Sequence, residues 1–179
     1  MITELLSVEG GRLIGLNYLV WWIRGGETLR FLPSIITQTG RLRNGREVNP
    51  CVESFSANPG WAGFKPVWVE ESAGQCFTQQ LDTVQALDTQ LPRGLVAKFP
   101  SAEELCYLMA FMHLRFGHSA FPPTSHRLRL LNRVCRGSSV EHLVLGRDEE
   151  GLLYISSCPD SEEAPDLGSV ALIRIYNLK

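Results

Sequence analysis

Cysteine is the first residue type in this chain that could do chemistry, because a thiolate is both a nucleophile and a soft metal ligand. Five cysteines are present, at positions 51, 76, 106, 135 and 158. No two are close enough in sequence to form a C-x-x-C pair or a zinc-ligand spacing. Cys135, which has Arg133 and Arg136 nearby, is the best candidate for a reactive thiol, since positive neighbours favour the thiolate. We nevertheless expect all five, including Cys135, to be reduced, structural cysteines.

Histidines and acidic residues give no metal motif either. The chain has no H-x-x-x-H or H-E-x-x-H pattern, no glycine-rich phosphate loop and no G-x-S-x-G segment. An acidic segment near the C-terminus has the hard oxygen ligands that calcium prefers, Asp160, Glu162, Glu163 and Asp166. Its spacing matches no recognised calcium loop. The sequence therefore predicts no catalytic residue and no cofactor, and neither copper nor calcium is supported by ligand spacing.

Basic residues are concentrated in segment 126–136. We expect a helix here, on which three arginines would share one stripe, Arg129, Arg133 and Arg136. Such a stripe could bind phosphates or an acidic partner. The alternative is a solvated face, or one paired with the acidic residues of 148–166. A net charge of −2 gives no general attraction to nucleic acid.

The composition indicates one soluble globular domain. The chain has 179 residues, 44% of them hydrophobic and 20% charged, which is close to the globular average. The longest apolar stretch, 13–23, is too short to span a membrane as a helix. The N-terminal sequence MITELLSVEGG lacks the basic and apolar regions of a secretory signal. We therefore expect a cytoplasmic protein without a membrane partner.

Strand and turn signals dominate the first 70 residues, including Asn44-Gly45 as a hairpin turn and 56–63 as a loop. A helical period then begins, marked by Leu81, Val84, Leu87 and Leu91. A short strand at 95–99 leads to a second helix, which opens with a capping box of Ser101 and Glu104. Strands follow the third helix, at 141–146, 152–157 and 169–176. This order predicts an α+β fold with an antiparallel sheet.

Several short segments resemble the formylglycine-generating enzyme (sulfatase-modifying factor) family, in the same order. They are VEGGRLIG at 8–15, PVWVEESAGQCFTQQL at 66–81, KFPSAEEL at 98–105 and DLGSVALIRI at 166–175. The resemblance implies a single C-type-lectin-like domain, with two or three helices packed on a small twisted antiparallel sheet. The chain lacks counterparts of the family's G-N-x-W-E-W and R-G-G-S-W segments and of its closely spaced, copper-binding cysteine pair.

We therefore expect a non-catalytic module that binds a protein partner through loops 56–64, 118–126 and 159–166, because loops on a rigid scaffold often carry binding. Aromatic residues anchor many interfaces, and the expected contacts are Trp61, Phe64 and Phe121. Two alternatives remain open. One is a copper- or iron-dependent oxidoreductase of the same family, and the other is a nucleic-acid or acidic-partner binder that uses the arginine stripe.

Overall fold

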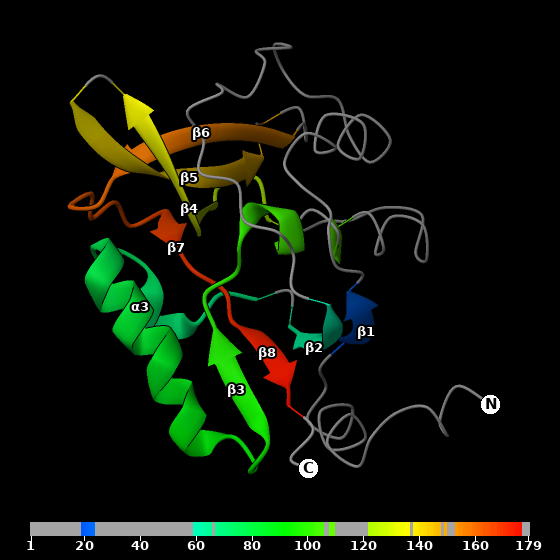
Figure 1. The fold of residues 1–179 in the computed structure, drawn as a ribbon. Coiled ribbons are helices and arrows are strands. Elements are labelled where there is room, and N and C mark those ends of the chain that lie inside the picture. The colour runs from blue at the N-terminus through cyan, green and yellow to red at the C-terminus, as the bar shows by residue number, and fades with distance from the viewer. Residues whose placement is uncertain are drawn as a thin grey trace.

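Two β-sheets and a long helical segment form the described part of the protein. The computed structural model describes residues 19–23, 59–65, 67–105, 108–109, 122–136, 138–147, 149 and 153–176. Figure 1 shows the two sheets one above the other, with helix α3 alongside strand β3. The α+β class predicted from the sequence is confirmed, but with two sheets in place of the single small sheet. No helix in the described residues is long and apolar enough to cross a membrane.

The first sheet has the strand order β1-β2-β8-β3, and all of its pairs are antiparallel. Its strands are β1 (Leu19–Ile23), β2 (Gly60–Phe64), β3 (Leu95–Lys98) and β8 (Leu172–Ile175). Among the described residues β3 forms one edge of this sheet. The outward backbone N–H of Ala97 in β3 is bonded to the side chain of Asp88, which comes from the adjacent 3-10 turn.

The second sheet has the strand order β6-β5-β4-β7. It contains β4 (Arg127–Arg136), β5 (Ser139–Arg147), β6 (Leu153–Pro159) and β7 (Leu167–Gly168). The β4–β5 and β5–β6 pairs are antiparallel, as the sequence predicts for the second of them, whereas β7 pairs with β4 in parallel. Since β7 and β8 are separated by only three residues, one continuous stretch of chain joins the two sheets.

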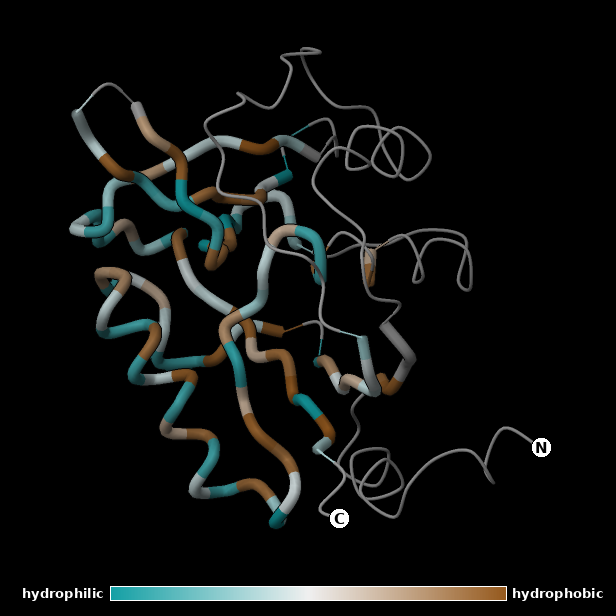
Figure 2. Tube along the Cα trace, in the orientation of Figure 1, coloured by the Kyte–Doolittle hydropathy of each residue, from teal (hydrophilic) through white to brown (hydrophobic). Residues whose placement is uncertain are grey.

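The main helical segment follows residues 67–76, which contain the 3-10 turn η2 (Glu70–Ser72). It consists of α3 (Phe77–Ala86) and the 3-10 turn η3 (Leu87–Gln90), and confirms the predicted helix. It ends before Pro92 and Gly94, and Gly94 has a φ of 91°, a conformation that glycine adopts without strain. Figure 2 shows polar and apolar residues alternating along α3 and apolar residues concentrated along β3 and β8. The apolar face of α3 packs on those strands through Phe77 and Val84.

The predicted capping box at the second helix is also present. The Ser101 N–H donates to Glu104 Oε2 at 3.1 Å, and the Glu104 N–H donates to Ser101 Oγ at 3.2 Å. Residues 102–105 and 108–109 are helical. Glu104 also accepts a hydrogen bond from Arg174 of β8, and Asn132 of β4 accepts the Ala102 N–H at 2.6 Å. The start of this helix is therefore bonded to both sheets.

The prediction of a third helix is wrong, because residues 127–136 form strand β4. Leu128, Leu130, Asn132 and Val134 are buried at alternate positions, and Arg129 is the one residue between them that is buried as well. That period of two is the alternation of a strand. A β-bulge interrupts the pairing with β5 between Arg129 and Arg133. The segment 60–63, predicted as part of a loop, is likewise strand β2, and the Asn44-Gly45 hairpin lies outside the described residues.

Candidate functional site

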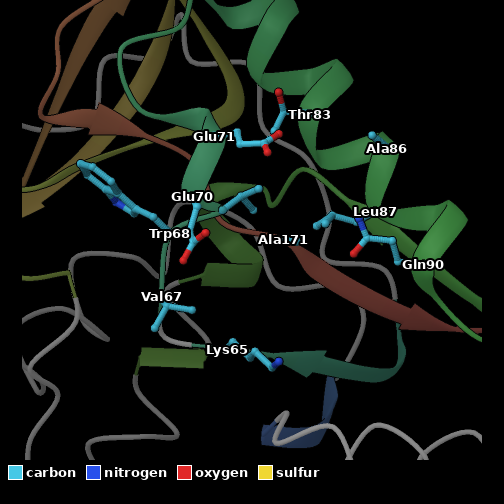
Figure 3. A pocket seen from close by; sticks show the side chains of 11 residues that line it. Lys65, Val67, Trp68, Glu70, Glu71, Thr83, Ala86, Leu87, Gln90 and Ala171 are labelled. Atoms are coloured by element: carbon cyan, nitrogen blue, oxygen red, sulfur yellow. The ribbon is translucent and has the colours of Figure 1, made fainter.

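A groove with a volume of about 290 Å³ lies between residues 65–71 and α3. We call it the α3 groove, and Figure 3 shows the side chains around it. Its lining combines apolar, acidic and polar side chains, and comprises Lys65, Val67, Trp68, Val69, Glu70, Glu71, Thr83, Ala86, Leu87, Gln90 and Ala171. These residues come from three separate parts of the sequence.

Buried polar contacts hold the walls of the α3 groove in place. The Ser72 hydroxyl donates to Val69 O at 2.7 Å and accepts the Ser169 N–H at 2.9 Å. From α3, the buried Gln80 amide donates to Ser72 O at 2.9 Å and to Leu167 O at 3.1 Å. These bonds fix η2 against both the helix and the β7–β8 connection. The groove is therefore formed before any ligand arrives, which reduces the entropy cost of binding.

The α3 groove has an apolar floor and an acidic rim. Val69 and Leu87 are partly buried against the core, and Ala171 is buried. Glu70 and Glu71 are exposed, and neither carboxylate has an ion-pair partner among the described residues. Figure 3 shows Glu71 near Thr83 of α3, and Lys65 at the opposite end. Such a site suits a ligand with an apolar body and a positive group.

The Trp68 indole packs away from this rim, against β7 and His126. The two ring centroids lie 4.1 Å apart. Gly168 permits this close packing, because a Cβ there would lie 3.0 Å from Trp68 Cδ2, inside normal contact distance. Trp68 thus anchors the groove wall to the second sheet.

The structure does not form the predicted arginine stripe. Arg129 is fully buried, and its guanidinium donates to five acceptors. They are Cys158 Sγ at 3.3 Å, Gln75 O at 3.3 Å, Gln80 Oε1 at 3.2 Å, Pro159 O at 3.3 Å and Glu162 O at 2.8 Å. Arg133 is exposed. Arg136 is the last residue of β4, and its side chain lies outside the described part of the structure. Arg129 joins α3 to the acidic segment and is not available for a surface ligand.

The acidic segment is paired with β4 through Arg127, a residue of the basic run outside the predicted stripe. Arg127 donates to Asp166 at 2.6 Å and to Glu162 at 3.0 Å. The hydrogen bonds from Arg127 lower the pKa of Asp166, and the bond to Asp166 raises the pKa of Arg127. Two of the four carboxylates proposed as calcium ligands are thus committed to an arginine. The described residues contain no group of three or more potential metal ligands.

The three aromatic residues expected to contact a partner differ in burial and in whether the structure describes them. Phe64 lies in β2 with a fully buried side chain, so it belongs to the core and not to a binding loop. Trp61 is also in β2 and is half-buried. Phe121 lies outside the described residues. The loop 56–64 therefore contributes a strand, and of loop 118–126 only residues 122–126 are described.

Three cysteines are described, and all have free thiols. Cys135 is exposed, Cys158 is buried and Cys76 is half-buried at the N-cap of α3. A hydrogen bond with Thr78, at 3.3 Å, and one from the Gln79 backbone lower the pKa of the Cys76 thiol. Burial raises the pKa of the Cys158 thiol in spite of its bond from Arg129. Cys51 and Cys106 lie outside the described residues.

His142 is a buried titratable group at the junction of β5, α3 and the acidic segment. Its ring stacks on Phe77 at a centroid distance of 3.7 Å. Nδ1 lies 2.9 Å from Leu130 O, so this nitrogen carries the proton of the neutral ring. Nε2 lies 3.4 Å from Asp160 Oδ1. Burial lowers the pKa of His142 below 6.5, an effect that Arg133 and Arg129 reinforce and that Leu130 O and Asp160 oppose.

This environment predicts a loss of stability in mild acid. The unfolded chain takes up a proton at His142 near pH 6.5, whereas the folded chain resists it. The free energy of unfolding should therefore decrease as the pH falls below 6.5, until the folded-state pKa is passed. His142→Asn keeps a donor for Leu130 O but does not titrate. Urea unfolding of both proteins between pH 8 and 5 measures the difference. The same pH dependence in both would contradict this role.

Sequence reasoning did not find the α3 groove. Its floor comes from residues 69, 87 and 171, which no local pattern connects. The only signal was the adjacent pair Glu70 and Glu71 beside Val67, whose side chain is 58% exposed in the structure. This signal does not reveal a recess, because the groove is formed only by the tertiary contacts between its three segments.

Comparison with known proteins identifies no relative. No family model matches the sequence, and no curated protein or solved structure matches it at a significant level. The function is therefore inferred from the geometry of the site.

Proposed function

We propose that this protein is a non-catalytic binding module that engages a protein partner at the α3 groove. The observation that carries the proposal is a preformed recess of about 290 Å³ that combines an apolar floor with exposed carboxylates, for which the described residues supply no ion-pair partner. Binding sites are commonly apolar recesses with a few well-placed polar groups. Val67, which lines the groove and is exposed, adds apolar surface that a partner segment can contact.

The same proposal includes the scaffold and the location. We assign the scaffold to the C-type-lectin-like type, supported by the resemblance of segments 66–81 and 98–105, which lead into the two helical regions. A cytoplasmic location agrees with the free thiols of the described cysteines, since such an environment keeps cysteines reduced.

Two arginine variants on the same helix test the binding function. Ala86 lines the α3 groove, whereas its exposed neighbour Gln85 does not. We expect wild type and Gln85→Arg to capture the same single protein from source-cell lysate in stoichiometric amount, at low salt and at about 0.5 M salt. Ala86→Arg fills the groove and should reduce that capture at least about tenfold. Both variants add one positive charge to an exposed helix position.

Equal capture by the two variants would refute binding at the α3 groove. Capture of nucleic acid or acidic protein only at low salt would also refute it, because about 0.5 M salt screens contacts that are mainly electrostatic. That result would favour Arg133, an exposed arginine of β4.

A further inference from the structure

We propose that the α3 groove binds the side chain of one arginine or lysine from the partner, with the aliphatic stem on the floor and the cationic head at Glu70 and Glu71. This rests on the proposed function, because it names the chemistry that the same groove recognises.

The size of the α3 groove favours a single long side chain. Pockets that enclose a whole small-molecule ligand or cofactor typically measure about 300–1,000 Å³. A volume of about 290 Å³ lies just below this range. It can accommodate an extended side chain and the peptide bonds next to it, while a large cofactor would remain mostly outside.

The distribution of polarity in the α3 groove matches a basic side chain. Val69, Leu87 and Ala171 offer apolar contact along the floor. Glu70 and Glu71 place two carboxylates at the rim, and these have no ion-pair partner among the described residues. Arginine and lysine combine a methylene stem with a cationic head, so they satisfy both parts at once. Acidic and purely apolar side chains satisfy at most one.

Nuclear magnetic resonance titration of the whole chain tests this chemistry directly. The probes are the N-acetyl methylamides of arginine, lysine and citrulline, and the readout is the amide shifts of α3 and η2. Citrulline has nearly the shape of arginine but no charge. We expect saturable shifts with arginine or lysine, and affinity for citrulline at least about tenfold weaker. The tighter of the two cations identifies the residue. Equal binding of arginine and citrulline, or no shifts with either cation, would overturn the proposal.

A charge-matched pair of double variants tests the rim. Glu70→Gln/Glu71→Gln should weaken the probe at least about tenfold, while Glu149→Gln/Glu163→Gln removes the same charge from exposed positions outside the groove and should leave it unchanged. Equal loss in both would overturn the proposal, because the attraction would then be general.

Partner capture separates failure of this inference from failure of the binding function. If Ala86→Arg abolishes capture but Glu70→Gln/Glu71→Gln retains it fully, the groove binds its partner without recognising a basic residue, and only this inference falls. If Ala86→Arg retains capture, the binding function falls as well. Loss in both variants supports the two together.

Discussion

Arg129→Met should lower the free energy of unfolding by about 3 kcal/mol, although the substitution keeps most of the apolar stem. The five guanidinium hydrogen bonds would be lost, and four oxygen acceptors of Gln75, Gln80, Pro159 and Glu162 would lose their donor. An unsatisfied buried acceptor costs about 1–3 kcal/mol. The total stays near 3 because Pro159 and Glu162 lie close to the surface, where water can replace the lost donor.

Arg133→Met is the matched control, because Arg133 belongs to the same strand but is exposed. It should change stability by less than about 0.5 kcal/mol. Urea unfolding with a constant m-value measures both variants. Equal effects at the two positions would show that Arg129 does not join α3 to the acidic segment as a buried residue. They would instead support the exposed position that the sequence suggested for it.

Phe64→Ala is expected to cost about 3–5 kcal/mol, the range for removing a large buried aromatic side chain. Phe64 is fully buried in the core between the two sheets, where its cluster includes Leu128 and Leu172. A residue that serves as a surface contact would instead change stability little. The substitution therefore distinguishes the core position from the binding contact that the sequence suggested.

Two further variants keep the Phe64 test informative. Phe64→Leu leaves most of the volume and should cost only about 1 kcal/mol, so it remains measurable if Phe64→Ala does not fold. Val140→Ala removes a side chain that is 49% exposed and should have little effect. Thermal and urea unfolding give the values. A cost below about 1 kcal/mol for Phe64→Ala would contradict its burial.

Local sequence signals correctly predicted the elements that depend on contacts between residues close in the sequence. The spacing of Leu81, Val84 and Leu87 identifies the main helix, and the Ser101–Glu104 box marks the start of the next one. Both depend on contacts within a few residues. The α+β class follows from the order of such elements.

Strand β4 shows where local signals are ambiguous. Leu128, Leu131 and Val134 fit a helical period, and Leu128, Leu130 and Val134 fit a period of two. The pairing with β5 selects the strand, and Leu131 is left only partly buried. The sequence of a short apolar segment does not show which other element it will pair with. The arginine stripe was predicted from the helical period, and it was wrong because the segment pairs with β5 as a strand.

The sequence did not predict the α3 groove for a related reason. Its floor and walls are joined by contacts between distant residues, such as the bonds from Gln80 to Ser72 and Leu167. Arg129 likewise gathers acceptors from residues 75–80 and 158–162. Only the pairing of basic and acidic segments was predictable, because opposite charges in excess on two segments favour contact without precise geometry.

The bond between Asp88 and Ala97 also affects how copies of this chain behave toward one another. An unpaired edge strand offers its backbone groups to any similar strand, and this is a common route to aggregation. At β3 the Asp88 carboxylate accepts the hydrogen bond of the Ala97 N–H, which an incoming strand would need for pairing. It also adds a negative charge at this edge of the sheet. Among the described residues β3 is an edge of its sheet, and one side chain from the helical segment thus protects that edge from intermolecular pairing at high protein concentration.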